Sequence, residues 1–255
     1  KDSPLRLGID FSGGVERFEL RLEGALMHGG GAHRWVGGYN PRPLLNFLNT
    51  QQDAEPGEID QMALNELLAA QSDGQILPTY QDRNDDWIPQ AVGGFEWGIP
   101  YNDRDTLFLT AEYFYNGAGY SDARLYPWLV IQEEFTPLYV GEHYAAVNVA
   151  IPRPGRWDDT TFLVSTVGNL SDLTFLSRID VQQKLMTHMS LFIYAAYHFG
   201  LPKDGCASSE RQNCGEGELH LSTEIPAIAG VPGLEQGLSL EAPMFDLGLW
   251  ISIAL

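Results

Sequence analysis

An alternating segment at the end of the printed sequence constrains the fold more than any other feature. In residues 245–255, one side of an extended chain would carry Phe245, Leu247, Leu249, Ile251, Ile253 and Leu255, and the other side Asp246, Gly248, Trp250, Ser252 and Ala254. Successive side chains of a strand point to opposite faces, so this segment is predicted to be a strand with one wholly apolar face. About nine to eleven residues patterned in this way are what a strand needs to cross a lipid bilayer.

The same period-two pattern recurs along most of the chain. Leu5, Leu7, Ile9 and Phe11 alternate with polar or small residues, and Phe18, Leu20 and Leu22 alternate with charged ones. Strands are predicted over 5–11, 17–26, 87–99, 107–115, 141–151, 160–168, 175–185, 188–199 and 245–255. Amphipathic strands joined in sequence order predict an all-β antiparallel meander that closes into a transmembrane β-barrel.

The predicted connections alternate in length. Tight turns are expected around 12–14, 102–105 and 186–187, and long connections over 29–86, 116–138 and 200–242. Short turns on the periplasmic side and long loops outside are the usual asymmetry of outer-membrane barrels. The link 169–172 is short for the outer side and the link 151–159 is long for the inner side, so this rule is not followed everywhere.

Residues 29–86 form the longest interruption of the strand pattern. A structureless loop of this length is uncommon in a compact domain. Within it, Ile59, Met62, Ala63 and Leu67 recur near helical spacing, which predicts one short helix over 58–71 in a long extracellular loop. The chain is therefore interpreted as a single β-barrel domain, 1–255, with the loop insertion 29–86.

The number of predicted strands indicates whether they are enough to form a whole barrel. Bacterial single-chain barrels have an even number of strands, and the count here is about nine. The sequence therefore predicts either strands that precede Lys1 or one further strand within 217–240, where residues 218–225 alternate weakly.

Charge and hydropathy exclude several classes of protein. The chain has 15 Lys and Arg against 34 Asp and Glu, a formal net charge of −19. This argues against a nucleic-acid partner, which requires clustered basic side chains, and against docking on an anionic membrane surface. The sequence also has no apolar run of about 18 residues, as a transmembrane helix requires.

The only two cysteines, Cys206 and Cys214, lie close together in the polar segment CASSERQNC. This spacing favours a local disulfide over two free thiols, and a disulfide would place the segment in an oxidising compartment.

Charged residues on the predicted strands form the main candidate site. They are Arg17, Glu19, Arg21, Glu23, Glu96, Glu112, Arg178, Asp180 and Lys184. Charges within membrane strands usually face an aqueous interior, because exposure to lipid is costly. Two interpretations stay open: a pore lining that selects solutes by charge, and a ladder of cross-strand ion pairs that fills a narrow barrel.

Three stretches carry a resemblance to a known class. They are EYFYNGAGYSD (112–122), LFIYAAYHFG (191–200) and the terminal FDLGLWISIAL. In these stretches the chain is similar to the C-terminal portion of porin-like outer-membrane proteins of Gram-negative bacteria. The resemblance implies a closed antiparallel barrel with a polar interior in the outer membrane, in contact with lipid and lipopolysaccharide.

Other chemistry-bearing residues give weaker signals. His188 and Ser190 have a spacing compatible with an outer-membrane lipid hydrolase, but the surrounding THMSLF lacks the further motif of such enzymes. Acidic groups at 53–58 and 82–86 have no calcium-loop pattern, and His28 and His33 flank a glycine-rich turn. No catalytic residue, metal or cofactor is assigned.

The favoured hypothesis is a channel for passive passage of small solutes. The alternatives are a filled structural or adhesion barrel whose surface loops bind a partner, and a lipid hydrolase.

Overall fold

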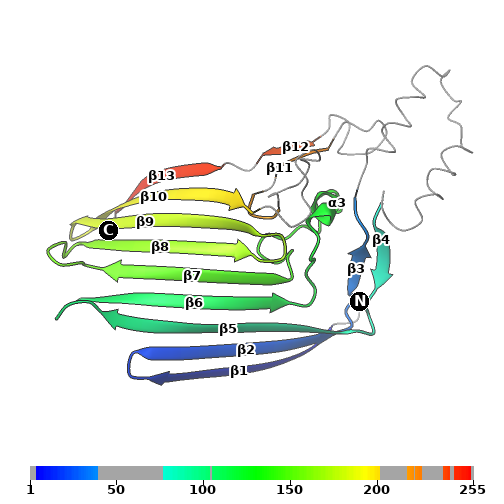
Figure 1. Ribbon diagram of the computed structural model, residues 1–255, viewed down its shortest axis with the longest axis horizontal. Coiled ribbons are helices and arrows are strands. Elements are labelled where there is room, and N and C mark those ends of the chain that lie inside the picture. The colour runs from blue at the N-terminus through cyan, green and yellow to red at the C-terminus, as the bar shows by residue number, and fades with distance from the viewer. Residues whose placement is uncertain are drawn as a thin grey trace, which may run out of the picture.

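The computed structural model describes residues 4–39, 77–103, 105–201, 217–220, 222–225, 238–241 and 244–253. Its main feature is a nine-stranded sheet in the order β1-β2-β5-β6-β7-β8-β9-β10-β13 (Figure 1). The strands are β1 (Leu5–Val15), β2 (Phe18–His28), β5 (Trp87–Pro100), β6 (Thr106–Asn116), β7 (His143–Pro152), β8 (Thr160–Asn169), β9 (Thr174–Met186), β10 (Met189–Gly200) and β13 (Phe245–Ile253).

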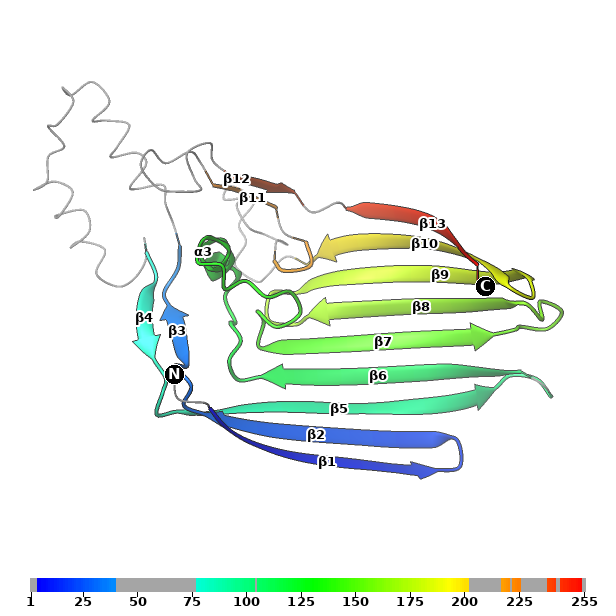
Figure 2. The same cartoon turned by 180° about the vertical axis from the view of Figure 1, so that it is seen from behind.

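Every neighbouring pair in this sheet is antiparallel, so the chain forms a meander. Each of the nine predicted strands is present, and the antiparallel all-β prediction is confirmed. One end of the sheet carries the connections 16–17, 101–105, 153–159 and 187–188, and we call it the turn end. The other, the loop end, carries 29–86, 117–142, 170–173 and 201–244 (Figures 1 and 2).

The register divides the nine strands into two chemically different faces. Across β1, β2 and β5, Phe11 pairs with Leu22 and Leu22 with Gly93, and comparable rows continue to β13. We call this side the apolar face. It includes Ile9, Leu20, Phe95, Leu109, Val147, Val164, Ile179, Ile193 and Leu249, and no Asp, Glu, Lys or Arg of the nine described strands lies on it.

The opposite side, the charged face, holds every charged side chain of these strands. They are Arg6, Asp10, Glu19, Arg21, Glu23, Glu96, Glu112, Arg178, Asp180, Lys184 and Asp246. Most of the large apolar side chains exposed on the sheet belong to the apolar face, such as Ile9 (77%) and Leu247 (67%). The period-two pattern of the sequence therefore separates the faces across the whole sheet.

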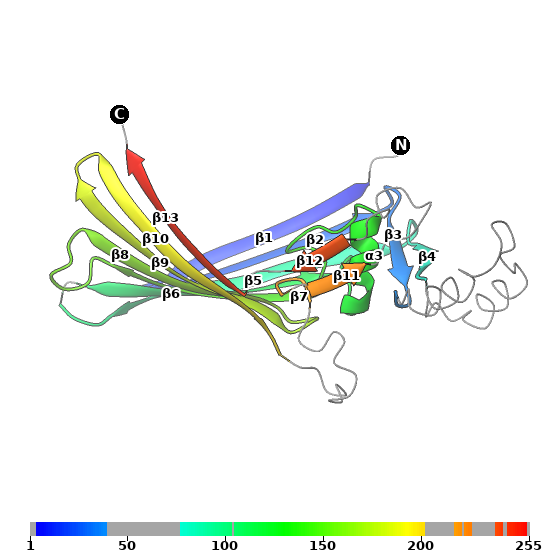
Figure 3. The same ribbon diagram turned by 90° about the horizontal axis from the view of Figure 1, so that it is seen from above.

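The sheet is open, so the prediction of a closed barrel is not met by these strands alone. β1 and β13 are its two edges and do not pair with each other; Figure 3 shows them diverging as the sheet twists. Because nine antiparallel strands place the first and last in the same direction, a direct β1–β13 seam would have to be parallel. Antiparallel closure of this sheet requires an odd number of further strands between these edges.

The β1–β2 hairpin corrects one predicted turn. Residues Ser12, Gly13 and Gly14, expected to form a turn, continue β1, and the chain reverses at Glu16 and Arg17. Glu16 adopts a left-handed backbone with φ of 54°. Pairing Val15 with Phe18 keeps both side chains on the apolar face. The continuation of the apolar row to Val15 therefore decides where the chain reverses, although Gly13 and Gly14 favour an earlier turn.

Smaller elements cover the loop end. They are two hairpin sheets, β3 (His33–Val36) with β4 (Thr79–Asp82) and β11 (Ser222–Ile225) with β12 (Leu238–Glu241), and a 3₁₀ turn η1 (Ala123–Leu125) followed by the short helix α3 (Tyr126–Ile131). The helix predicted over 58–71 and the pair Cys206 and Cys214 lie outside the described residues. The weakly alternating segment near residue 220 contributes β11, which lies outside the nine-stranded sheet.

The main cluster of buried hydrophobic side chains lies at the loop end, whereas on the sheet itself only Ile88, Tyr144 and Ala196 are buried hydrophobic residues among those described. The cluster is formed by Tyr120, Leu125, Tyr126, Leu129 and Val140, with Trp35 and Phe135 packed against it. In the described part of the chain, no element is layered over the apolar face (Figure 3). No helix of this part is both long and apolar enough to cross a bilayer.

Candidate functional site

The charged face brings together most of the residues predicted from the sequence. β2 contributes Glu19, Arg21 and Glu23, β5 contributes Glu96, β6 contributes Glu112, and β9 contributes Arg178, Asp180 and Lys184. Arg17 is the exception, because it lies in the β1–β2 turn and not on a strand. Its carbonyl accepts a hydrogen bond of 2.8 Å from the backbone N–H of Gly98, which ties this turn to β5.

The ion pairs on this face are formed within strands and not between them. Arg21 Nε lies 2.9 Å from Glu19 Oε1, and Arg178 donates to both carboxylate oxygens of Asp180, with Nε 2.9 Å from Oδ2. The Arg178 guanidinium also lies 4.2 Å from the ring centre of Tyr194. Residues two apart on a strand share a face, which permits this pairing. Neither of these two ion pairs joins neighbouring strands.

Three carboxylates on neighbouring strands have no ion-pair partner among the described residues. They are Glu23, Glu96 and Glu112. Glu96 stands directly opposite Glu19 in the β2–β5 register, and Glu112 is opposite Gly94, two residues from Glu96. Since Arg21 is hydrogen-bonded to Glu19, this region of β2, β5 and β6 carries an excess of negative charge.

A polar row crosses the sheet at the level of these carboxylates. Consecutive register partners place Glu19, Glu96, Thr110, Asn148, Ser165, Arg178, Ala196 and Asp246 side by side from β2 to β13. All except Ala196 carry a polar or charged group. A row of this kind is suited to contact with water and not to packing in an apolar core.

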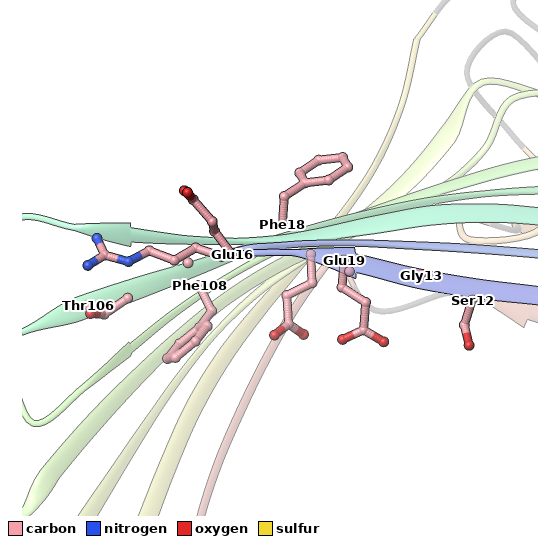
Figure 4. Close-up of a pocket in the computed structure, with 11 residues that line it drawn as sticks. Ser12, Gly13, Glu16, Phe18, Glu19, Thr106 and Phe108 are labelled. Atoms are coloured by element: carbon pink, nitrogen blue, oxygen red, sulfur yellow. The ribbon is translucent and has the colours of Figure 1, made fainter.

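A hollow of about 630 Å³ lies on the sheet beside this row, near the turn end. In Figure 4, Ser12, Glu19 and Phe108 point to one side of the strands, whereas Phe18 points to the other. The hollow is lined by Ser12, Gly13, Gly14, Glu16, Arg17, Phe18, Glu19, Glu96, Gly98, Thr106 and Phe108. Glu19 and Glu96 therefore border open space, and Gly14 and Gly98 leave room for it.

A second polar cluster, at the loop end, was not predicted from the sequence. Residues 217–220, which we call the strap, lie against β7 and the β8–β9 connection through Glu218. Glu218 Oε2 accepts hydrogen bonds from the Tyr144 hydroxyl at 2.6 Å and from Asn169 Nδ2 at 2.9 Å, and Oε1 accepts one from the backbone N–H of Leu138. The Glu218 N–H donates to Asp172 Oδ2 at 2.8 Å.

Burial dominates the electrostatics of the strap. Loss of water around the Glu218 side chain raises the pKa of its carboxyl above the ordinary value, although the hydrogen bonds from Tyr144, Leu138 and Asn169 act in the opposite direction. The strap is held further by His198 Nδ1, 2.8 Å from the Leu219 carbonyl oxygen. Only the turn residues Asn169 and Asp172 could have hinted at this cluster, because Glu218 has no local sequence pattern.

The other candidate residues do not assemble into a site. His188 lies in the β9–β10 turn and Ser190 is on β10 opposite Lys184, and no hydrogen bond joins the two. Asp86 pairs with Arg83 Nε at 2.9 Å in the β4–β5 turn, and Asp82, the last residue of β4, accepts a hydrogen bond from the backbone N–H of Asn84. Within the described residues, no group of three or more His, Cys, Asp or Glu is arranged to hold a metal ion.

Comparison with known proteins found no matching family model, no matching curated protein and no matching solved structure.

Proposed function

We propose that this chain is part of an outer-membrane β-barrel of a Gram-negative bacterium, with its apolar face in contact with lipid and its charged face lining a passage for small solutes. The observation that supports this most directly is the absence of any charged side chain on the apolar face of the nine strands. On a sheet wetted by water on both sides, charges would be tolerated on either face. Their confinement to one face suits a sheet with two different solvents.

The size of the apolar face supports the same proposal. Nine strands spaced about 4.8 Å apart, each about ten residues long at about 3.3 Å per residue, give a face on the order of 1,400 Å². The largest apolar patch on a typical soluble monomer is roughly 300–600 Å². An apolar face of this size must be shielded from water. Lipid would shield it without any further element of the protein.

Aromatic side chains gather at both ends of the apolar face. At the loop end they are Trp87, Tyr113, Tyr115, Phe175, Tyr197, Phe199 and Phe245, and at the turn end Phe18, Trp97 and Phe162. Between them the strands carry mainly aliphatic residues such as Val147, Val164 and Ile179. Belts of aromatic residues at the two lipid–water interfaces are typical of membrane barrels.

The proposed arrangement is a barrel in which this sheet forms part of the wall. Antiparallel closure would require an odd number of further strands between β13 and β1, because β1 and β13 run in the same direction. The long connections would face the outside, in contact with lipopolysaccharide, and the short turns the periplasm. The water-facing side would then be lined by the polar row.

Single-channel recording tests the proposal. The full chain is purified in detergent, reconstituted into planar phosphatidylcholine bilayers, and the current at constant voltage is measured in KCl. Steady open current supports a passage. A protein that inserts into vesicles and resists external protease yet carries no current supports the filled structural barrel, and a chain that stays in solution without detergent and does not insert refutes the membrane assignment.

A further inference from the structure

The net charge of the charged face indicates which solutes the passage admits. Carboxylates outnumber cations there: Asp10, Glu19, Glu23, Glu96, Glu112, Asp180 and Asp246 stand against Arg6, Arg21, Arg178 and Lys184. The pairing sharpens this excess, because Arg21 is hydrogen-bonded to Glu19 and Arg178 to Asp180. Arg21 also lies within electrostatic reach of Glu96 and Glu112, so this one cation faces three carboxylates.

The cations of these strands without an ion-pair partner among the described residues are Arg6 and Lys184, which lie at opposite ends of the sheet. Lys184 lies near the turn end of β9, and Arg6 lies near the loop end of the edge strand β1. Glu96 and Glu112, by contrast, lie on adjacent strands on either side of Thr110, which is opposite Glu96 and two residues from Glu112. Glu96 also borders the hollow near the turn end. Arg17, in the β1–β2 turn, lines this hollow together with Glu96, Glu19 and Glu16, whereas Glu112 lies on the same face outside its lining.

We infer that the charged face favours cationic over anionic small solutes, and that Glu96 and Glu112 are the residues that determine this preference. The inference rests on the proposed function in one respect, because it requires the charged face to be in contact with water. Both carboxylates act through long-range attraction and repulsion of a hydrated ion, so no dehydrated binding site is needed. The polar row supplies further neutral hydrogen-bonding groups, from Thr110, Asn148 and Ser165, along which a hydrated solute can pass.

The size of the preference follows from Coulomb's law. Glu96 is opposite position 110, where Cβ atoms are about 5 Å apart, and Glu112 is two residues along β6 at about 3.3 Å per residue, so each carboxylate lies roughly 6–7 Å from a probe at position 110. In water at physiological salt, one such charge enriches a monovalent cation about 1.7-fold, and two enrich it about threefold. The same two charges deplete an anion about threefold, so the expected ratio of cation to anion is about tenfold.

Thiol modification measures this ratio without requiring a current. Cys206→Ser and Cys214→Ser remove the native thiols, and Thr110→Cys places one thiol beside both carboxylates. The protein in phosphatidylcholine vesicles is treated with trimethylammonioethyl methanethiosulfonate or with the anionic sulfonatoethyl reagent. Each rate is divided by the rate of the same reagent with free cysteine. The corrected rate of the cationic reagent should exceed that of the anionic reagent about tenfold.

Charge-neutralised variants assign the effect to its residues. Glu96→Gln together with Glu112→Gln should lower the ratio to about one, whereas Asp103→Asn in the β5–β6 turn, a control with the same charge change per residue, should leave it unchanged. If the double variant does not fold, Glu112→Gln alone, at an exposed and unpaired position, should lower the ratio about threefold. A ratio near one in the parent, or an unchanged ratio in the variants, overturns the inference.

Bilayer recording keeps the two proposals separable. In a tenfold KCl gradient, a reversal potential of the sign expected for K⁺ preference, shifted toward zero by the double variant, supports both. Absence of current with a tenfold thiol ratio refutes the passage but supports the charge preference of the face. Steady current with anion preference supports the passage and overturns the inference.

Discussion

Substitution of one lipid-facing residue distinguishes a membrane sheet from a soluble one. Val147 lies in the middle of β7 on the apolar face, opposite Ala111 and Thr166, and the residue is 45% exposed. Asn148, its neighbour, lies on the charged face opposite Thr110 and Ser165. Val147→Arg and Asn148→Arg therefore place the same charge at nearly the same depth on opposite sides of the sheet.

The two substitutions should differ in cost if only one face contacts lipid. An arginine on the lipid face of a membrane barrel near the bilayer midplane costs about 2–4 kcal/mol, while a substitution on a water-exposed surface usually changes the free energy of unfolding by about 0.5 kcal/mol or less. Because 1.4 kcal/mol is a factor of ten, Val147→Arg should lower the ratio of folded to unfolded protein roughly 30- to 900-fold. Asn148→Arg should lower it by no more than about threefold.

Urea titration of protein folded into phosphatidylcholine vesicles, followed by tryptophan fluorescence, gives the free energy of unfolding of each variant. The comparison requires the same lipid and the same urea range for both proteins. Equal costs at the two positions would refute the assignment of the faces, since a half-exposed valine in water tolerates arginine as well as asparagine does. A larger cost at Asn148 would mean that the faces are reversed.

Three further predictions concern the loop end. Burial raises the pKa of Glu218, so the strap should stabilise the fold most at a pH below the ordinary glutamate pKa of 4.5, and this stabilisation should decrease as the pH rises through the raised pKa. Hydrogen exchange of the strap amides should become faster over the same pH range, and Glu218→Gln should remove this pH dependence. Leu129→Ala, at a side chain 1% exposed, should cost about 2–5 kcal/mol locally and expose the β6–β7 connection to limited proteolysis while circular dichroism of the sheet is retained. Gly119→Ala would place a Cβ 1.9 Å from the Gly141 carbonyl oxygen and should lower the protease resistance of that connection, whereas Gly8→Ala, with 3.8 Å to the nearest atom, should not.

The strands were predictable because a strand with one apolar and one polar face has apolar and polar residues in alternation along its sequence. A side-chain period of two fixes which residues share a face, and a slip of one residue would exchange the faces. The same rule explains the error at Ser12, Gly13 and Gly14. Glycine indicated a turn there, yet the apolar row continued to Val15, and that row decided where the hairpin reversed.

The strap and its partners could not be predicted from the sequence, because their contacts are distant and follow no period. Glu218 is separated from Tyr144 by 74 residues and from Asn169 by 49. Each of the three is an ordinary polar residue in its own segment. The pairing of Arg178 with Asp180 is local, but whether an arginine binds its own strand or the neighbouring one depends on rotamers and register, which the alternation does not specify.

Closure of the sheet into a barrel could not be predicted in the same way, because it depends on the total number of strands and not on the pattern of any one strand. Alternation defines each strand's faces but not the number of strands in the wall. The two edge strands, β1 and β13, each have one apolar face, present unpaired backbone groups along the outer edge of the sheet and contain no proline. Soluble proteins usually protect such edges with charges, prolines or bulges. In a bilayer an unpaired edge is costlier still, because no water is present to satisfy its N–H and C=O groups. The apolar face that favours a membrane therefore also requires that these two edges be paired there, and a parallel β1–β13 seam and an antiparallel seam through further strands are the two ways to pair them.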